Sequence, residues 1–173
     1  MELSSRIQDV SESITLKLNA KAVKMAEEGK KVYNLTAGQL PFRPMGELVD
    51  IMRGELDFLK SFQYSPVPGD AELRVKLIKY VEESRAIDFS KVDEDFGAVV
   101  SNGGKHALIN VLAALLNPGN EAVMIAPYWV SYPEMVKFCG AVPRIVQTSI
   151  YDGFVPSIDE LRDQINHKTK VII

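Results

Sequence analysis

Hydrophobic residues recur at helical spacing in three stretches of the N-terminal part of the chain. The first stretch comprises Leu16, Ala20, Val23 and Ala26. Gly29 follows it, and because glycine adopts the left-handed conformation of a helix cap without strain, this helix is predicted to end there. A second helix is predicted over residues 48–59, and a third begins after Asp70, whose carboxylate suits an N-cap.

Runs of β-branched and other hydrophobic residues predict strands between further helices. One short strand is predicted at residues 32–35. From about residue 97, strands near 97–101, 121–125, 142–147 and 170–173 alternate with helices. The S-x-x-E spacing at residues 131–134 and 157–160 is that of a capping box and predicts two of the helix starts. This alternation predicts an α/β fold with a mostly parallel sheet covered by helices.

Composition and charge narrow the class of protein. The chain has 173 residues, of which 46% are hydrophobic and 25% charged, as in an ordinary soluble globular protein. A net charge of −3 without a basic run argues against nucleic-acid binding. The single cysteine, Cys139, excludes an internal disulfide, and we interpret it as a packing residue. Because no membrane-length hydrophobic run or signal peptide is present, we predict no membrane association and a cytoplasmic location.

A predicted strand meets a glycine pair at the start of a hydrophobic helix. Gly103, Gly104 and Lys105 occupy this junction. The free amides and partial positive charge of a helix N-terminus attract anions, glycines let a ligand approach the backbone, and lysine adds a full charge. Trp129 follows the carboxyl end of the next strand, where ligands of parallel sheets bind. A phosphate cradle beside an aromatic face suits a planar, phosphorylated ring.

Each of these residues also has a plain structural interpretation. The glycine pair then forms a simple turn, Trp129 is a packing residue, and Lys105 is a surface charge; Tyr64 is an ordinary loop aromatic. The sequence contains neither G-x-G-x-x-G nor G-x-x-x-x-G-K-[ST], so nucleotide-binding loops fit poorly. His106 and His167 have no carboxylate or cysteine at ligand spacing, so we interpret both as structural and predict no metal site.

Several segments carry motifs of one known family. They include residues 35–39 (LTAGQ), 64–74 (YSPVPGDAELR), 101–108 (SNGGKHAL) and 126–133 (APYWVSYP). Together they resemble the N-terminal part of a class I, fold type I pyridoxal-phosphate-dependent aminotransferase, nearest the aspartate/aromatic aminotransferase group. The resemblance implies the N-terminal half of that fold. It also implies an arm and the first part of a small domain over residues 1–45, and the first half of the cofactor-binding large domain over residues 46–173.

The resemblance assigns roles to six residues. Those assigned to the cofactor pyridoxal 5'-phosphate are Gly103, Gly104, Lys105, Trp129 and Tyr64, and Gly38 is assigned to the substrate. The first three would hold the phosphate, and Trp129 would stack on the pyridine ring. Tyr64 would reach the phosphate bound by a partner subunit, which implies a homodimer. The backbone of Gly38 would lie against the substrate carboxylate. Residues 40–42 (LPF) depart from the family's usual Pro-Asp-Phe, so the path of this loop is expected to differ.

The family's reactive groups are not matched within these 173 residues. In the family, the Schiff-base lysine, the acidic partner of the pyridine nitrogen and the substrate-binding arginine lie beyond the part that this chain resembles. We therefore assign no catalytic residue and expect the chain alone to be inactive. Residues 169–173 have the pattern of a strand that stops without a turn, which favours a fragment, although a complete domain can also end on a strand.

Two functions from different classes follow. In the complete enzyme, an amino group would pass between an amino acid and a 2-oxo acid. The alternative is a non-catalytic protein of the same fold that binds a phosphorylated ligand or a partner. A related lyase or synthase that uses the same cofactor also remains open.

Overall fold

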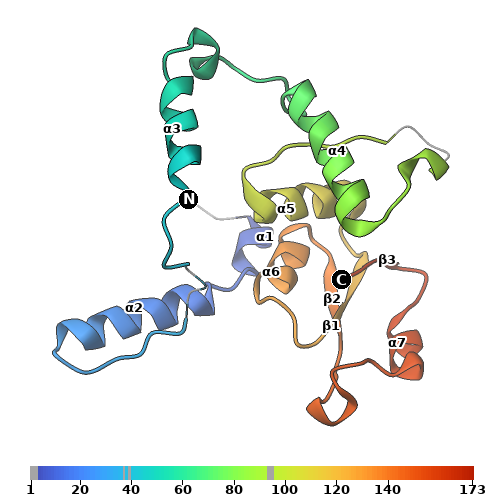
Figure 1. The fold of residues 1–173 in the computed structure, drawn as a ribbon. Helices are drawn as coiled ribbons and strands as arrows, with labels where there is room; N and C mark the ends of the chain where they lie inside the picture. The colour runs from blue at the N-terminus through green and yellow to red at the C-terminus, as the bar shows by residue number, and fades with distance from the viewer. Residues whose placement is uncertain (1–3, 37, 39, 93–95) are drawn as a thin grey trace. The chain divides into compact units, whose positions relative to one another are not determined.

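The computed structural model describes residues 4–36, 38, 40–92 and 96–173. The chain divides into two units, and the division falls within helix α5 (Gly103–Leu115). We call residues 1–39 with 108–173 the sheet unit and residues 40–107 the helical unit. Figure 1 labels their elements.

A parallel three-stranded sheet forms the centre of the sheet unit. Strand β1 (Glu121–Ile125) lies between β2 (Val142–Val146) and β3 (Thr169–Ile172) (Figure 1). Helix α6 (Ser131–Phe138) connects β1 to β2, and a 3-10 turn (Ile150–Asp152) and helix α7 (Ile158–Gln164) connect β2 to β3. Parallel strands need such crossovers, so the predicted order of elements is confirmed for these three strands.

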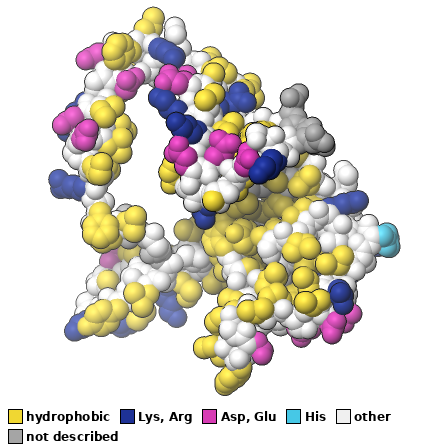
Figure 2. All heavy atoms as spheres, turned by 45° about the vertical axis from the view of Figure 1, so that its right-hand side comes forward, with side chains coloured by type: hydrophobic (Ala, Val, Ile, Leu, Met, Phe, Trp, Pro, Cys, Tyr) yellow, Lys and Arg dark blue, Asp and Glu magenta, His cyan; other side chains and the backbone are white. Residues whose placement is uncertain are grey.

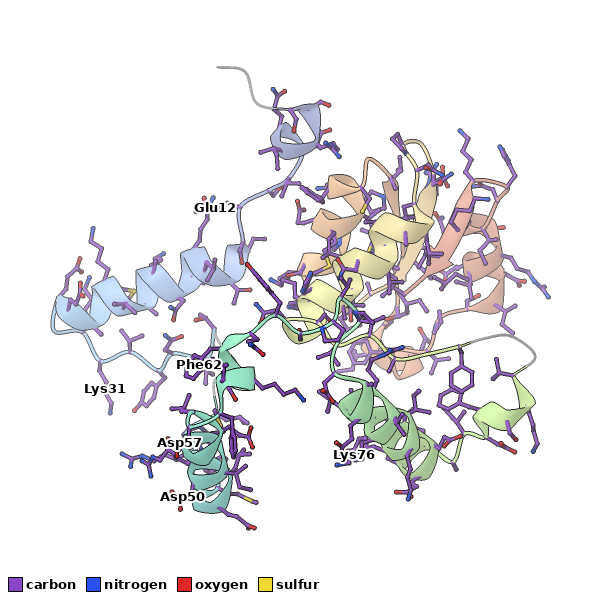
Figure 3. The ribbon with its side chains drawn as sticks, turned by 90° about the horizontal axis from the view of Figure 1, so that it is seen from above. Glu12, Lys31, Asp50, Asp57, Phe62 and Lys76 are labelled. Carbon is purple, nitrogen blue, oxygen red and sulfur yellow. The ribbon has the colours of Figure 1, made fainter. Side chains whose placement is uncertain are left out.

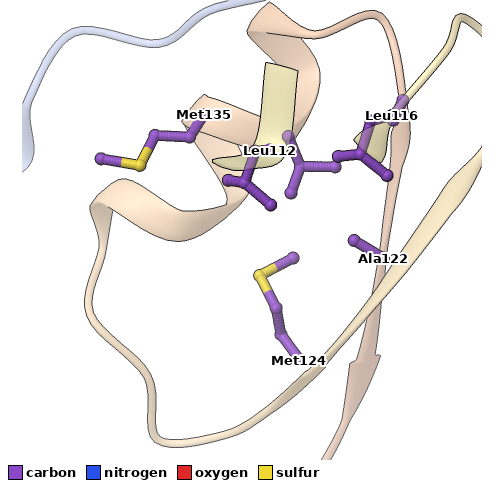
Figure 4. Close-up of a cluster of buried hydrophobic side chains, with 7 residues drawn as sticks. Leu112, Leu116, Ala122, Met124 and Met135 are labelled. Atoms are coloured by element: carbon purple, nitrogen blue, oxygen red, sulfur yellow. The ribbon is translucent and has the colours of Figure 1, made fainter. Parts of the chain in front are cut away.

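The hydrophobic core is built where α5 and α6 pack against β1. Its buried members are Leu112, Leu116, Ala122, Met124, Met135, Val136 and Ala141 (Figure 4). The first four residues of β1 are buried, as expected of a central strand covered on both faces. Cys139 packs against this cluster, and burial raises the pKa of its thiol. The packing interpretation of Cys139 is therefore confirmed.

The N-terminal residues contribute α1 (Ser5–Gln8) and α2 (Ile14–Glu27) to the sheet unit. Gly29 has φ +77° just beyond α2, which confirms the predicted helix end. The predicted strand at residues 32–35 is wrong, because these residues pair with no strand. Leu35 is 93% exposed, and the Asn34 side chain instead bonds to Asn19 at 2.8 Å. A hydrophobic run forms a strand only where another strand offers free backbone groups.

The helical unit contains α3 (Gly46–Glu55), a 3-10 turn (Leu59–Phe62), α4 (Ala71–Arg85), a second 3-10 turn (Phe89–Lys91) and the first residues of α5. Asp70 caps α4 as predicted, accepting hydrogen bonds from the amides of Glu72 at 3.0 Å and Leu73 at 3.1 Å. The predicted second helix is shorter than expected, since α3 ends at Glu55. Figure 3 shows Asp50 on α3 and Lys76 on α4.

The strand predicted near residues 97–101 is also wrong. Its described residues are extended but join no sheet. The Val100 amide donates to the carbonyl of Pro68 at 2.9 Å, and the Arg74 guanidinium donates to the carbonyl of Ala98 at 2.5 Å. These two backbone groups therefore have partners outside the sheet, in residues distant in the sequence.

The two predicted capping boxes have different outcomes. At α7, the Ser157 hydroxyl accepts the Glu160 amide at 3.5 Å, so the predicted helix start is confirmed. At α6, the N-cap is Val130 and the box at residues 131–134 is wrong, although the helix itself is present. The Glu134 carboxylate accepts the Ser11 amide at 2.6 Å and pairs with Lys137 at 2.9 Å. A contact distant in sequence therefore replaces the expected local one.

Candidate functional site

The glycine pair opens α5, as the sequence predicts. Gly103 has φ +81°, a left-handed conformation that a side chain would strain. A Cβ built on Gly103 or Gly104 would meet no heavy atom of the described residues within 4 Å. The backbone of this turn is therefore open to a close approach by a ligand.

Two amides of this turn are already engaged within the turn itself. The Gly103 amide donates to the Ser101 carbonyl at 2.8 Å. The Asn102 amide donates to Nδ1 of His106 at 3.1 Å. The structure therefore gives His106 a defined local role, which the sequence reasoning missed.

The turn has the donor chemistry that a phosphate group requires. A 13-residue helix begins here, so its first-turn amides and dipole favour an anion. Lys105 adds a positive charge within the same turn. Open glycines, helix amides and a lysine fit the phosphate of the implied cofactor, as in other helix-terminus anion sites.

Trp129 belongs to the sheet unit, in the loop that follows the carboxyl end of β1. Its carbonyl accepts the Tyr132 amide at 2.9 Å, and the two rings meet edge to face at 5.5 Å between centroids. Tyr128 packs against the hydrophobic core, while Trp129 is 42% exposed. The loop is thus anchored, and its indole retains exposed surface suited to stacking.

The remaining predicted site residues are exposed. Tyr64 is fully exposed and lines an open hollow of about 760 Å³ with Ser61, Phe62 and Gln63. Gly38 is also exposed, and the described residues leave space around it. The structure brings Gly103, Gly104 and Lys105 together on one turn. A joint site that also includes Trp129, Tyr64 and Gly38 stays a prediction.

The strongest electrostatic perturbation lies at the opposite end of β1 from Trp129. Glu121 is buried and accepts two hydrogen bonds from Arg144, at 2.9 and 3.1 Å, and one from Asn166 at 2.8 Å. The Arg144 bonds, followed by that of Asn166, lower the pKa of Glu121 from 4.5 to about 2. This cluster joins β1 to β2 and to the turn before β3. A charge at the start of a buried strand was the available sequence signal.

Two further properties concern metals and membranes. Within the described ranges, no group of three or more His, Cys, Asp or Glu residues is arranged to hold a metal ion. No helix in the described part of the chain is long and apolar enough to span a bilayer.

Three parallel strands connected by helices define an α/β protein, and a glycine-lysine turn opens one of its helices. Residues 30–173 match the family described as Aminotransferase class I and II, and the chain belongs to that family. Family membership places the chain on the fold type I scaffold, whose known structures it resembles closely.

Bacterial aminotransferases are similar over nearly the whole chain. An aspartate/prephenate aminotransferase of Thermus thermophilus is 36% identical over 171 residues, covering 99% of this chain and 43% of that protein. An aspartate aminotransferase of Thermotoga maritima is 34% identical, covering 99% of this chain and 44% of that protein. The structure of Thermus thermophilus aspartate aminotransferase with maleate aligns with a TM-score of 0.86 at 34% identity, over 99% of this chain and 44% of that one. The chain thus spans less than half the length of these relatives.

Proposed function

We propose that this chain provides the phosphate-binding and ring-stacking part of a pyridoxal 5'-phosphate site in an aminotransferase. The observation that carries the proposal is the family match over residues 30–173, which includes an open glycine-lysine turn at the start of α5. The reaction proposed for the complete enzyme transfers an amino group between an amino acid and a 2-oxo acid. The names of the relatives favour aspartate as one amino donor.

The proposed roles follow the chemistry of each residue. The backbone at Gly103 and Gly104 and the charge of Lys105 hold the phosphate. Trp129 packs on the pyridine ring and excludes water from one of its faces. When bound, the cofactor supplies an electron sink for bonds at the amino acid's α-carbon. Lys105 is a phosphate contact, so no residue of this chain is assigned to the chemical step.

Assembly and location extend the same proposal. Residues 1–45 are proposed as the arm and the first part of a small domain, and residues 46–173 as the first half of the cofactor-binding domain. The fully exposed Tyr64 is available for the phosphate bound by a second copy of the chain, in a homodimer. Gly38 is proposed to contact the substrate carboxylate, and the protein is proposed to act in the cytoplasm.

Cofactor binding is tested with the intrinsic fluorescence of Trp129, the only tryptophan in the sequence. Pyridoxal 5'-phosphate should quench this fluorescence at a lower concentration than pyridoxal, which lacks the phosphate. Equal binding of the two compounds contradicts the proposed phosphate site. The same comparison with pyridoxine 5'-phosphate and pyridoxine, which have no aldehyde, removes the effect of non-specific reaction with surface lysines.

Turnover is tested separately with aspartate and a 2-oxo acid. The 173-residue chain should bind the cofactor without producing a new amino acid. Turnover by this chain alone would show that a reactive lysine lies within it, contrary to our assignment. Binding of phosphate compounds that do not contain the pyridine ring, as tightly as the cofactor, would favour the non-catalytic alternative.

A further inference from the structure

The Asn102 amide and the His106 imidazole form a hydrogen bond at the start of α5. The amide donates to Nδ1 over 3.1 Å. An imidazole nitrogen accepts a hydrogen bond only when it carries no proton. The bond therefore uses the lone pair of Nδ1 as its acceptor.

This bond closes the turn that contains the glycine pair. Asn102 directly precedes α5, and His106 lies four residues further along, within the first turn of the helix. The side chain thus reaches back to an amide at the helix start, as the Glu or Gln of a capping box does. With the bond from the Gly103 amide to the Ser101 carbonyl, it fixes the two peptide groups on either side of Asn102.

We propose that His106 is a positioning residue of the phosphate-binding turn. By holding the Asn102 amide, it keeps Gly103 in its left-handed conformation and the glycine pair open before the anion arrives. Gly103 then contributes open backbone beside the phosphate, and the amides from Gly104 onward, at the start of the helix, are the donors. This inference rests on the proposed function of the same turn.

A positioning role for His106 and a competition between His106 and the phosphate predict opposite changes in the affinity for phosphate. If His106 pre-organises the turn, removing its acceptor loosens the backbone and weakens phosphate binding. If His106 competes with the phosphate for the Asn102 amide, removing the acceptor releases a donor and strengthens binding. The sign of the change therefore decides between the two.

The test compares two variants of the 173-residue chain. His106→Phe keeps a ring but has no acceptor, whereas His106→Asn places an amide oxygen near the position of Nδ1. We expect the Asn102 amide hydrogen to exchange with solvent about 3- to 10-fold faster in His106→Phe than in the unmodified chain. In His106→Asn, the exchange rate should return to that of the unmodified chain. The ring nitrogen spectrum of the unmodified chain should show an unprotonated Nδ1. A protonated Nδ1, or equal exchange in both variants, overturns the proposal.

Binding of inorganic phosphate and pyridoxal 5'-phosphate completes the test. His106→Phe should weaken the binding of pyridoxal 5'-phosphate about 3- to 10-fold, and His106→Asn should recover it. In the unmodified chain, the Gly104 amide signal should move more than that of Asn102. Tighter binding by His106→Phe overturns the positioning role. If no amide of the turn responds while the exchange pattern holds, the proposed function fails at this turn and the His106 hydrogen bond stands.

Discussion

The sheet unit and the helical unit bury hydrophobic side chains to very different degrees. Every buried hydrophobic side chain among the described residues lies between Leu112 and Val146, in the sheet unit. In the helical unit, Ile51 and Met52 of α3 are 56% and 60% exposed. Figure 2 shows hydrophobic side chains alongside charged ones on the visible surface. The two units therefore differ in what holds their helices in place.

The difference shows which interactions stabilise each unit. In the sheet unit, buried residues of α5, α6 and β1 stabilise one another by removing hydrophobic area from water. In the helical unit, the interactions include caps, tight turns, the ring contact of Phe89 with Phe96, and surface ion pairs such as Lys76 with Glu72 at 2.6 Å. Exposed ion pairs contribute little to stability. Core substitutions should therefore affect the sheet unit most, and turn substitutions the helical unit.

The largest expected effect is at the centre of the core. Met124→Ala should lower the free energy of unfolding by about 2–5 kcal/mol, because the fully buried side chain leaves a cavity. Met52→Ala is the matched control in the helical unit, where the side chain is 60% exposed, and should change stability by about 0.5 kcal/mol or less. Chemical denaturation followed by Trp129 fluorescence measures the first, and circular dichroism the second. Equal effects would remove the distinction between the units.

In the helical unit, the strongest response should come from a turn. Gly69 has φ +99°, and a Cβ built there would lie 2.6 Å from Cγ2 of Val100. Gly69→Ala should therefore destabilise the unit by about 1–3 kcal/mol, through backbone strain and a steric clash. Gly54→Ala, in α3 with open space around it, should stabilise by up to about 1 kcal/mol. Amide exchange at Val100 and helix content during unfolding measure the stability of both variants. If Gly69→Ala leaves stability unchanged, the turn accommodates a side chain without strain.

The proposed ring contact of Trp129 and the proposed phosphate contact at Gly103 can be tested separately. Trp129→Ala should weaken the binding of both pyridoxal and pyridoxal 5'-phosphate by about 1–3 kcal/mol, because it removes contact with the ring. Gly103→Val should weaken the binding of pyridoxal 5'-phosphate by at least as much and leave the affinity for pyridoxal unchanged. Calorimetric titration of the two ligands measures this selectivity. Unchanged affinities in both variants would return these residues to a structural role.

The smallest expected effect is a loss of stability of the sheet unit at acidic pH. The pKa of Glu121 is about 2 in the folded chain, below its ordinary value of 4.5, so the folded state binds this proton less readily. The stability that Glu121 contributes is complete above about pH 4.5 and is lost as pH falls through about 2. Unfolding midpoints should fall over this range in the unmodified chain, and less steeply in Glu121→Gln. Glu160→Gln, at an exposed position of α7, should leave the slope unchanged.

Local signals in the sequence predicted the helices and the central strands well. Asp70 caps α4 and Gly29 follows α2, since both functions depend on neighbouring residues only. Strands β1 and β2 were predicted close to their observed positions. In β1 the hydrophobic run is buried, and in β2 exposed residues alternate with less exposed ones, as in a strand with one covered face. The glycine pair at the start of α5 was likewise predicted from its immediate neighbours.

Long-range partners account for what the sequence did not reveal. Residues 32–35 and 97–101 have strand-like composition, yet neither segment joins the sheet, and Val100 and Ala98 instead bond to Pro68 and Arg74. Glu134 was assigned to a capping box, but its carboxylate receives the amide of Ser11, 123 residues away. The bonds of Glu121 to Arg144 and Asn166 likewise span 23 and 45 residues. Residue spacing alone contains no information about such pairs.

The sequence by itself determined the α/β class, the family, the helix caps and the open glycine turn, because each depends on a short run of neighbouring residues or on a motif. Only the tertiary structure decided which hydrophobic runs became strands and which carboxylates became buried. A strand needs a partner edge, and a buried charge needs a counter-charge brought close by folding. Those pairings are chosen by the packing of distant segments, and local pattern does not encode them.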